Sequence, residues 1–206
     1  MIKKTAIKGI SLSLIIFILV FNIFSLHGQG NLDKKFKKFA DRHDMEYQIP
    51  KNYVGIKVAY GYSPNTDFLQ SRLDHSIKSK KRAVAVVFAL MSTKPDDTPR
   101  GRRIREVLGN PDKINLGAIA VEIDTTLSKM KYLDTLQLKK VNANRGIIYN
   151  LKVSNKYCGV YPLCKKIILH KDHVGRAEIF FFYNKGDDVL VDDEINKTWG
   201  MLKFKP

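Results

Sequence analysis

The chain has 206 residues, a formal net charge of +16 and 44% hydrophobic residues. The excess of lysine and arginine favours contact with anionic partners, although a basic surface can also serve only to keep a protein soluble. The sequence contains no glycine-rich phosphate loop, serine nucleophile elbow, paired catalytic carboxylates or cofactor fingerprint. It therefore indicates no cofactor, no metal and no particular enzyme class.

The first 30 residues have the order of segments that is typical of a secretory signal peptide. A short stretch with three lysines is followed by an apolar run over residues 10–26 and then by small residues, and no acidic residue precedes Asp33. The alternative is an uncleaved anchor, in which residues 10–26 would be the only part in contact with the membrane. We expect residues 1–30 to be a signal peptide and residues 31–206 to form one basic α+β domain.

Export changes the expected partner of the domain. Removing residues 1–30 takes away three lysines and no acidic residue, so the net charge falls to +13 and 176 residues remain. That length is enough for one domain with its own hydrophobic core. We expect a periplasmic or secreted protein, membrane-anchored in the alternative, whose partner is an anionic envelope component or a protein. Nucleic acid is not the expected partner.

Five segments follow in the first half of the domain. Apolar residues at three- and four-residue spacing over 32–40 are interleaved with lysines, which predicts an amphipathic helix with a basic outer face. Strands are predicted over residues 45–50 and 54–62, and residues 68–77 carry a weak helical pattern. The apolar run over residues 83–91 predicts a central strand that is covered on both faces.

A polar segment over residues 93–112 carries the sharpest functional candidate in the sequence. It contains three prolines together with Arg100, Arg102, Arg103 and Arg105. Long excursions of this kind tend to be functional or disordered, and guanidinium groups match the geometry of phosphate and carboxylate groups. We hypothesise that these arginines bind an anionic envelope partner; the alternative is a solvated basic loop.

The middle of the chain predicts further strands and a short helix. Residues 116–124 alternate between apolar and other residues, which predicts a strand, and residues 127–133 are expected to form a short helix. Residues 136–141 and 147–153 flank a run of turn residues and predict a hairpin.

Both cysteines of the chain lie in one short segment, at Cys158 and Cys164. Exported proteins meet oxidising conditions, so the spacing predicts a local disulfide. A loop of this length contributes only about 2 kcal/mol on the loop-entropy model. The spacing differs from the Cys-x-x-Cys of redox motifs, and one cysteine pair is too few for a structural zinc site.

The last third of the domain predicts a second hairpin and a closing helix. The hairpin strands are expected over residues 166–171 and 177–183, with three phenylalanines facing both sides of the second strand. Apolar residues at helical spacing predict a helix from Val191 to Leu202. The whole pattern predicts an α+β fold, a mostly antiparallel sheet of hairpins flanked by N- and C-terminal helices.

Two clusters in this region admit a functional and a structural interpretation. His170 and His173 bracket a turn, with Glu178 as a conceivable partner in an acid–base or metal site, but two polar turn residues are the simpler interpretation. Five acidic residues between Asp187 and Glu194 do not have the spacing of a calcium loop. We interpret them as caps of the closing helix.

The segment from Tyr47 to Tyr53, the hairpins and the closing segment from Val191 to Phe204 together resemble the fold of PsbP, the extrinsic photosystem subunit. The order of elements covers most of the mature chain. The resemblance implies an antiparallel sheet sandwiched by helices and a binding or accessory role, and it carries over no site residues. The chain is also similar to small exported bacterial proteins.

We interpret the chain as an exported cell-envelope protein, a non-enzymatic binding or accessory domain for an anionic or protein partner. The alternative is a small hydrolase that acts on an envelope or extracellular polymer, with His170 or His173 in its site. A deep pocket joining either histidine to a carboxylate would favour the enzyme. A flat basic face beside the arginine segment would favour binding.

Overall fold

The computed structural model describes residues 31–59, 62–64, 73–92, 119–120, 122–125 and 130–206. The predicted signal peptide lies outside these residues. None of the helices in the described ranges is long and apolar enough to cross a membrane.

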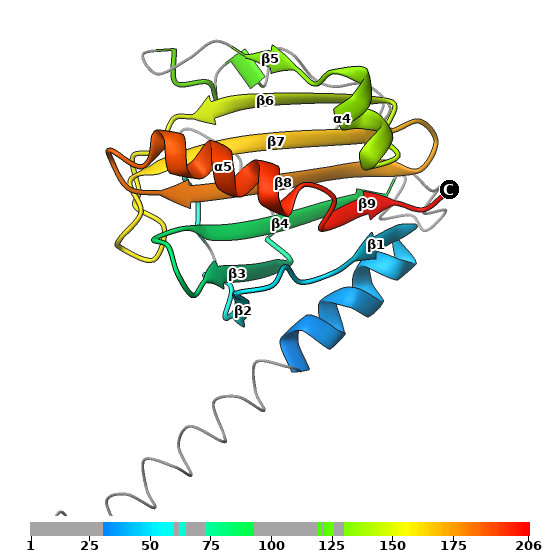
Figure 1. Ribbon diagram of the computed structural model, residues 1–206, viewed down its shortest axis with the longest axis horizontal. Helices are drawn as coiled ribbons and strands as arrows, with labels where there is room; N and C mark the ends of the chain where they lie inside the picture. Colours follow the sequence, from blue (N-terminus) through cyan, green and yellow to red (C-terminus); the bar gives the residue numbers. More distant parts are fainter. Residues whose placement is uncertain (1–30, 60–61, 65–72, 93–118, 121, 126–129) are drawn as a thin grey trace, which may run out of the picture.

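A seven-stranded sheet organises the described part of the chain, and each strand is antiparallel to its neighbours (Figure 1). Across the sheet the order is β2 (Tyr53–Ile56), β3 (His75–Ser79), β4 (Ala85–Ser92), β8 (Gly175–Tyr183), β7 (Leu163–Lys171), β6 (Arg145–Leu151) and β5 (Lys131–Tyr132). A second sheet pairs β1 (Met45–Tyr47) with β9 (Leu202–Phe204). The described ranges include a helix over residues 31–42, helix α4 (Thr135–Lys140) and helix α5 (Asp188–Thr198). The predicted α+β class is confirmed.

The large sheet separates two hydrophobic clusters. Figure 1 shows α4, α5 and β9 lying across one face of the sheet, with the helix over residues 31–42 at the corner near β1 and β2. The cluster under these elements contains Phe88 and Phe181, whereas Phe180 and Phe182 belong to the cluster on the opposite face. Successive residues of a strand point to opposite faces, so the three phenylalanines of β8 fill both cores. The prediction for this strand is confirmed.

The predicted hairpin over residues 136–153 is wrong in its first arm, because residues 135–140 form helix α4. The Asp134 carboxylate accepts a hydrogen bond from the backbone N–H of Gln137, and the Gln137 side chain accepts one from the backbone N–H of Asp134. This reciprocal capping box starts the helix. The neighbours of β6 are instead β5 and β7.

Four other segments differ from the sequence prediction. Residues 75–79 form strand β3 instead of the end of a helix, because they pair on both sides with β2 and β4. Residues 119, 120 and 122 are helical, whereas the alternating pattern predicted a strand there. Residues 131–132 form the edge strand β5, and Leu202 leaves the closing helix to begin β9. At β3, β5 and β9, long-range strand pairing outweighs local periodicity.

Candidate functional site

The helix over residues 31–42 presents a continuous basic face to solvent. Lys34, Lys38 and Arg42 follow one another at four-residue spacing, and Lys35 and Lys37 flank that row. All five side chains are exposed. Side chains three and four residues apart lie on one side of a helix, so the five cations form one surface, which we call the basic face.

The opposite side of the same helix anchors it to the domain. Phe36 and Ala40 are buried in the core cluster that also holds Phe88. The Phe36 ring stacks on His75 of β3 with centroids 4.5 Å apart, and it meets the Tyr47 ring edge-on at 4.7 Å. The helix is therefore part of the packed domain, and its basic face has a fixed orientation.

A buried polar contact holds the start of the helix against the sheet. Nε2 of His75 lies 2.9 Å from a carboxylate oxygen of Asp33 and 3.3 Å from the Tyr47 hydroxyl. Burial lowers the pKa of His75, and the carboxylate of Asp33 offsets only part of that effect. The Asp33 carboxylate also sits where a Cβ on Gly55 of β2 would come within 3.1 Å of it, so glycine leaves the space that the carboxylate needs.

Acidic groups do not neutralise the basic face. The helix has two carboxylates, and both are engaged elsewhere: Asp33 with His75, and Asp41 with Lys205 at 2.6 Å. Within the described ranges, Lys34, Lys35, Lys37 and Lys38 take part in no ion pair. Arg42 lies over the Phe39 ring, 5.9 Å from its centroid. Like charges at four-residue spacing cost a helix about 0.2–0.5 kcal/mol per pair, so this clustering slightly opposes folding.

A groove of about 440 Å³ lies between this helix, β1 and the turn before β9. Lys37 and Asp41 line its helix side, and Glu46 and Lys203 line its strand side. Glu46 and Lys203 pair with each other at 2.9 Å, and Asp41 pairs with Lys205. Lys37 is thus the one lining cation of the groove without an ion-pair partner among the described residues.

A second charged cluster is buried on the sheet face that points away from α5. Nζ of Lys166 lies 2.7 Å from Glu122 and 3.0 Å from Glu178, and Arg176 also contacts Glu178 at 3.0 Å. The Lys166 and Glu178 side chains are only 3% and 5% exposed. The Tyr149 hydroxyl donates to Glu122 at 2.7 Å, which completes the network.

The charges in this network stabilise one another. Burial alone would lower the pKa of Lys166, but the carboxylates of Glu178 and Glu122 outweigh it and the pKa is raised. Burial alone would raise the pKa of Glu178, but Lys166 and Arg176 outweigh it and the pKa is lowered. Both residues are therefore charged at neutral pH. A fixed ion pair of this kind supports the fold and leaves neither group free for proton transfer.

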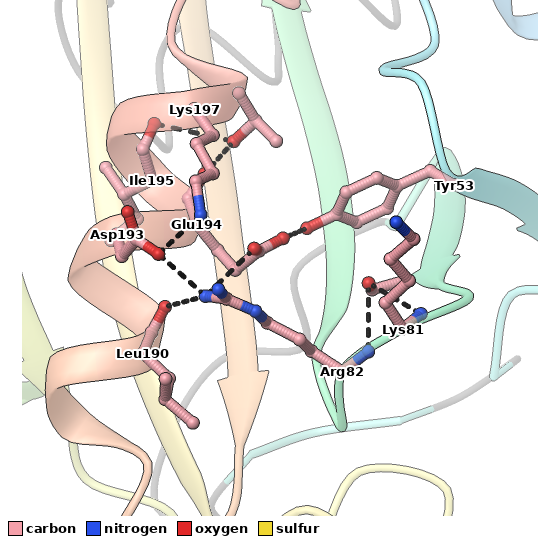
Figure 2. Close-up of polar contacts among 10 residues, drawn as sticks. Tyr53, Lys81, Arg82, Leu190, Asp193, Glu194, Ile195 and Lys197 are labelled. Carbon is pink, nitrogen blue, oxygen red and sulfur yellow. Dashed lines mark hydrogen bonds and ion pairs between the residues drawn. The ribbon is translucent and has the colours of Figure 1, made fainter.

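The predicted side-chain cap of α5 is wrong, although Asp188 lies in the first turn, and the later acidic residues Asp192, Asp193 and Glu194 form ion pairs. Asp187 occupies the N-cap position, but its side chain makes no capping hydrogen bond. Figure 2 shows Arg82 reaching α5, where it lies 2.9 Å from Asp193 and 3.1 Å from Glu194. The Tyr53 hydroxyl donates to Glu194 at 2.5 Å. These contacts tie α5 to the β2–β3 edge of the sheet.

The structure does not bring His170 and His173 together in one site. His170 lies on β7, is fully buried, and contacts Arg145 and Asp172. His173 is exposed in the β7–β8 turn, where its φ of 60° lies in the left-handed region. Neither lines the groove described above. In the described part of the chain, no group of three or more His, Cys, Asp or Glu side chains is arranged to hold a metal ion.

Of the two sites predicted from the sequence, the described residues include the cysteine pair and not the arginine cluster. Arg100, Arg102, Arg103 and Arg105 lie outside the described residues. The structure has Cys158 and Cys164 as free thiols, the first exposed in a turn and the second buried in the cluster that also contains Phe180 and Phe182. Burial raises the pKa of the Cys164 thiol well above its usual value.

Thiol labelling distinguishes this arrangement from the predicted disulfide. In unreduced native protein we expect a maleimide to modify Cys158 alone, because Cys164 is buried and protonated. Unfolding in urea should then expose a second reactive thiol, which intact-mass measurement counts directly. If neither thiol reacts before or after unfolding, the disulfide is present and the free-thiol arrangement is wrong.

No family model and no curated protein matches the chain. Among solved structures it is similar to the solution structure of cyanobacterial PsbP (CyanoP) from Synechocystis sp. PCC 6803. The TM-score is 0.37 and the identity 10%, and the match covers 79% of this chain and 88% of that chain. This is the fold that the sequence resembles, and the likeness is weak. The function of this chain is therefore inferred from its own residues alone.

Proposed function

We propose that this protein is an exported cell-envelope protein that acts as a non-enzymatic binding or accessory domain, and that its basic face contacts an anionic envelope partner. One observation carries the proposal. Five cations share one exposed side of a helix, whose two carboxylates are paired elsewhere. The helix is anchored through Phe36 and Ala40, so binding does not require it to fold first.

The size of the effect follows from general electrostatics. A lysine or arginine near an anionic surface contributes about 1 kcal/mol, so five such residues contribute about 5 kcal/mol. That energy corresponds to an affinity gain of several thousandfold. Exposed charges are screened over about 10 Å at 0.1 M salt, so the interaction weakens as ionic strength rises. An anionic partner also relieves the repulsion among the clustered lysines.

The arginine segment adds a second contact to this proposal. Arg100, Arg102, Arg103 and Arg105 come from the sequence alone. Their guanidinium groups suit phosphate and carboxylate partners. Replacing all four with alanine tests their part separately from that of the helix: unchanged affinity for an anionic ligand would remove the arginine segment from the binding surface.

The hydrolase alternative draws no support from the two histidines on which it was based. His170 is buried beside Arg145 and Asp172, and His173 is exposed at a turn. Glu178, the conceivable carboxylate partner, is paired with Lys166 and Arg176. We therefore do not propose a hydrolytic site.

Binding to a soluble polyanion tests the proposal. The chain, in the form in which the cell exports it, is titrated with dextran sulfate as a probe. Two variants are compared with it. The helix variant changes four lysines of the basic face to glutamate, and the control variant does the same to four exposed lysines elsewhere, Lys131, Lys152, Lys156 and Lys185. Each variant lowers the net charge of residues 31–206 from +13 to +5.

We expect the helix variant to bind roughly 100- to 1,000-fold more weakly than the wild type, because four contributions of about 1 kcal/mol are lost. The control variant should lose far less, since its lysines lie outside the basic face. A cooperative thermal unfolding transition, measured for each variant, checks that both variants are folded. Equal losses in the two variants would show that only net charge matters, and the basic face would then have no special role.

A further inference from the structure

The inference rests on the proposed function and names the partner. We infer that the basic face binds the surface of a phospholipid bilayer with anionic headgroups, and that the helix over residues 31–42 lies against this surface without entering it. Three properties of the described residues favour a bilayer over a polysaccharide or protein partner: the shape of the face, the chemistry of its side chains, and its place in the chain.

The shape of the basic face suits a planar partner. Lys34, Lys38 and Arg42 lie along the outer side of the helix, with a rise of roughly 6 Å between successive members of the row. Lys35 and Lys37 widen this row on its two sides. Apart from Lys37, these cations stand outside the groove beside β1. A convex row of charges makes simultaneous contact with a flat surface, whereas a single polymer chain would be held better in a cleft.

The side-chain chemistry favours diffuse charge over specific recognition. Four of the five cations are lysines, which act as point charges and lack the two-pronged geometry of arginine. The apolar residues of the helix are committed to the domain, since Phe36 and Ala40 are buried and Leu32 and Phe39 are half-buried. The helix therefore has no exposed apolar stripe to insert between lipids, and binding is electrostatic and peripheral.

The place of the face in the chain brings it near a bilayer. The apolar run ends at Leu26 and the described helix includes Asn31, so four residues separate them in the sequence. The five residue steps from Leu26 to Asn31 span at most about 18 Å. Of the two carboxylates of the helix, Asp41 is paired with Lys205, and the half-buried Asp33 points toward the sheet, where it is hydrogen-bonded to the buried His75. During export, and afterwards if the run is retained, the basic face lies close to lipid headgroups.

Vesicle binding tests this inference. The exported form of the chain is mixed with vesicles of phosphatidylcholine alone or with 30% phosphatidylglycerol, and bound protein is measured by sedimentation. The wild type is compared with the variant that changes Lys34, Lys35, Lys37 and Lys38 to glutamate, and with the control variant of matched charge. A third variant changes the same four lysines to glutamine, so that the result does not depend on how well one variant folds.

We expect the wild type and the control variant to bind the anionic vesicles at least tenfold more strongly than the neutral ones. The glutamate variant should lose about 100-fold or more of its affinity for anionic vesicles, and the glutamine variant should lose less. Equal binding of all four proteins to anionic vesicles would overturn the inference. Binding to dextran sulfate that depends on the helix, without binding to anionic vesicles, would also overturn it but leave the proposed function standing. Failure to bind either probe would overturn both.

Discussion

Replacing Lys166 with alanine is expected to lower the free energy of unfolding by about 3–5 kcal/mol, because it removes the buried cation that the Glu122 and Glu178 carboxylates share. Lys166 is 3% exposed and contacts both Glu122 and Glu178. Arg176 remains beside Glu178 in the variant, but Glu122 keeps only the Tyr149 hydroxyl among the partners described above. Urea unfolding followed by circular dichroism measures the change.

Lys165 provides a matched control for this substitution. It is the preceding residue of β7, so its side chain points to the other face of the sheet, where it pairs with the exposed carboxylate of Asp192. Exposed ion pairs contribute about 0–1 kcal/mol, so alanine at Lys165 should cost little. Equal losses at the two positions would show that the Lys166 network does not stabilise the fold.

Replacing Phe36 with alanine is expected to cost about 3–5 kcal/mol of stability, the usual range for deleting a buried aromatic ring. Phe36 is 3% exposed and packs against His75, Tyr47 and Phe88. The substitution removes the packing contact that holds the helix over residues 31–42 to the sheet. Denaturant unfolding of the variant measures it.

The neighbouring Lys35 serves as the control for Phe36. Its side chain is exposed on the other side of the helix, and alanine is a strong helix former, so the Lys35 variant should stay within about 0.5 kcal/mol of the wild type. If the Phe36 variant is equally stable, the helix is not docked as described. The orientation of the basic face would then be unsupported.

The sequence allowed the prediction of those elements whose signal is local or strongly apolar. The amphipathic pattern over residues 32–40 predicted the first helix, and the apolar runs predicted β4 and β8 as strands covered on both faces. The β7–β8 hairpin followed from its turn residues. These segments carry their pattern in consecutive residues, so no knowledge of distant partners was needed.

Elements that depend on distant partners could not be predicted. Strand β3 is only five residues long and exists through its pairing with β2 and β4. Helix α4 was not predicted, although the capping box of Asp134 and Gln137 is a local sequence signal for a helix start, because the turn residues after it are also typical of a hairpin.

At the candidate site, too, local features could be predicted from the sequence and long-range contacts could not. The basic outer face of the first helix was visible in the sequence, but nothing in the sequence showed that Asp33 and Asp41 are paired elsewhere and leave it unneutralised. His75 and Tyr47 come from separate strands, so their contact with Asp33 required the fold. The Lys166 network likewise joins residues that are far apart in sequence, as with Glu122.

The most direct test of the proposed function compares the two charge variants on one anionic ligand. Both carry the same net charge, and they differ only in whether the four lost lysines belong to the basic face or lie outside it. We predict that the affinity for dextran sulfate at 0.1 M salt falls roughly 100-fold or more in the helix variant and far less in the control. Equal affinities in the two variants would contradict a binding role for the basic face.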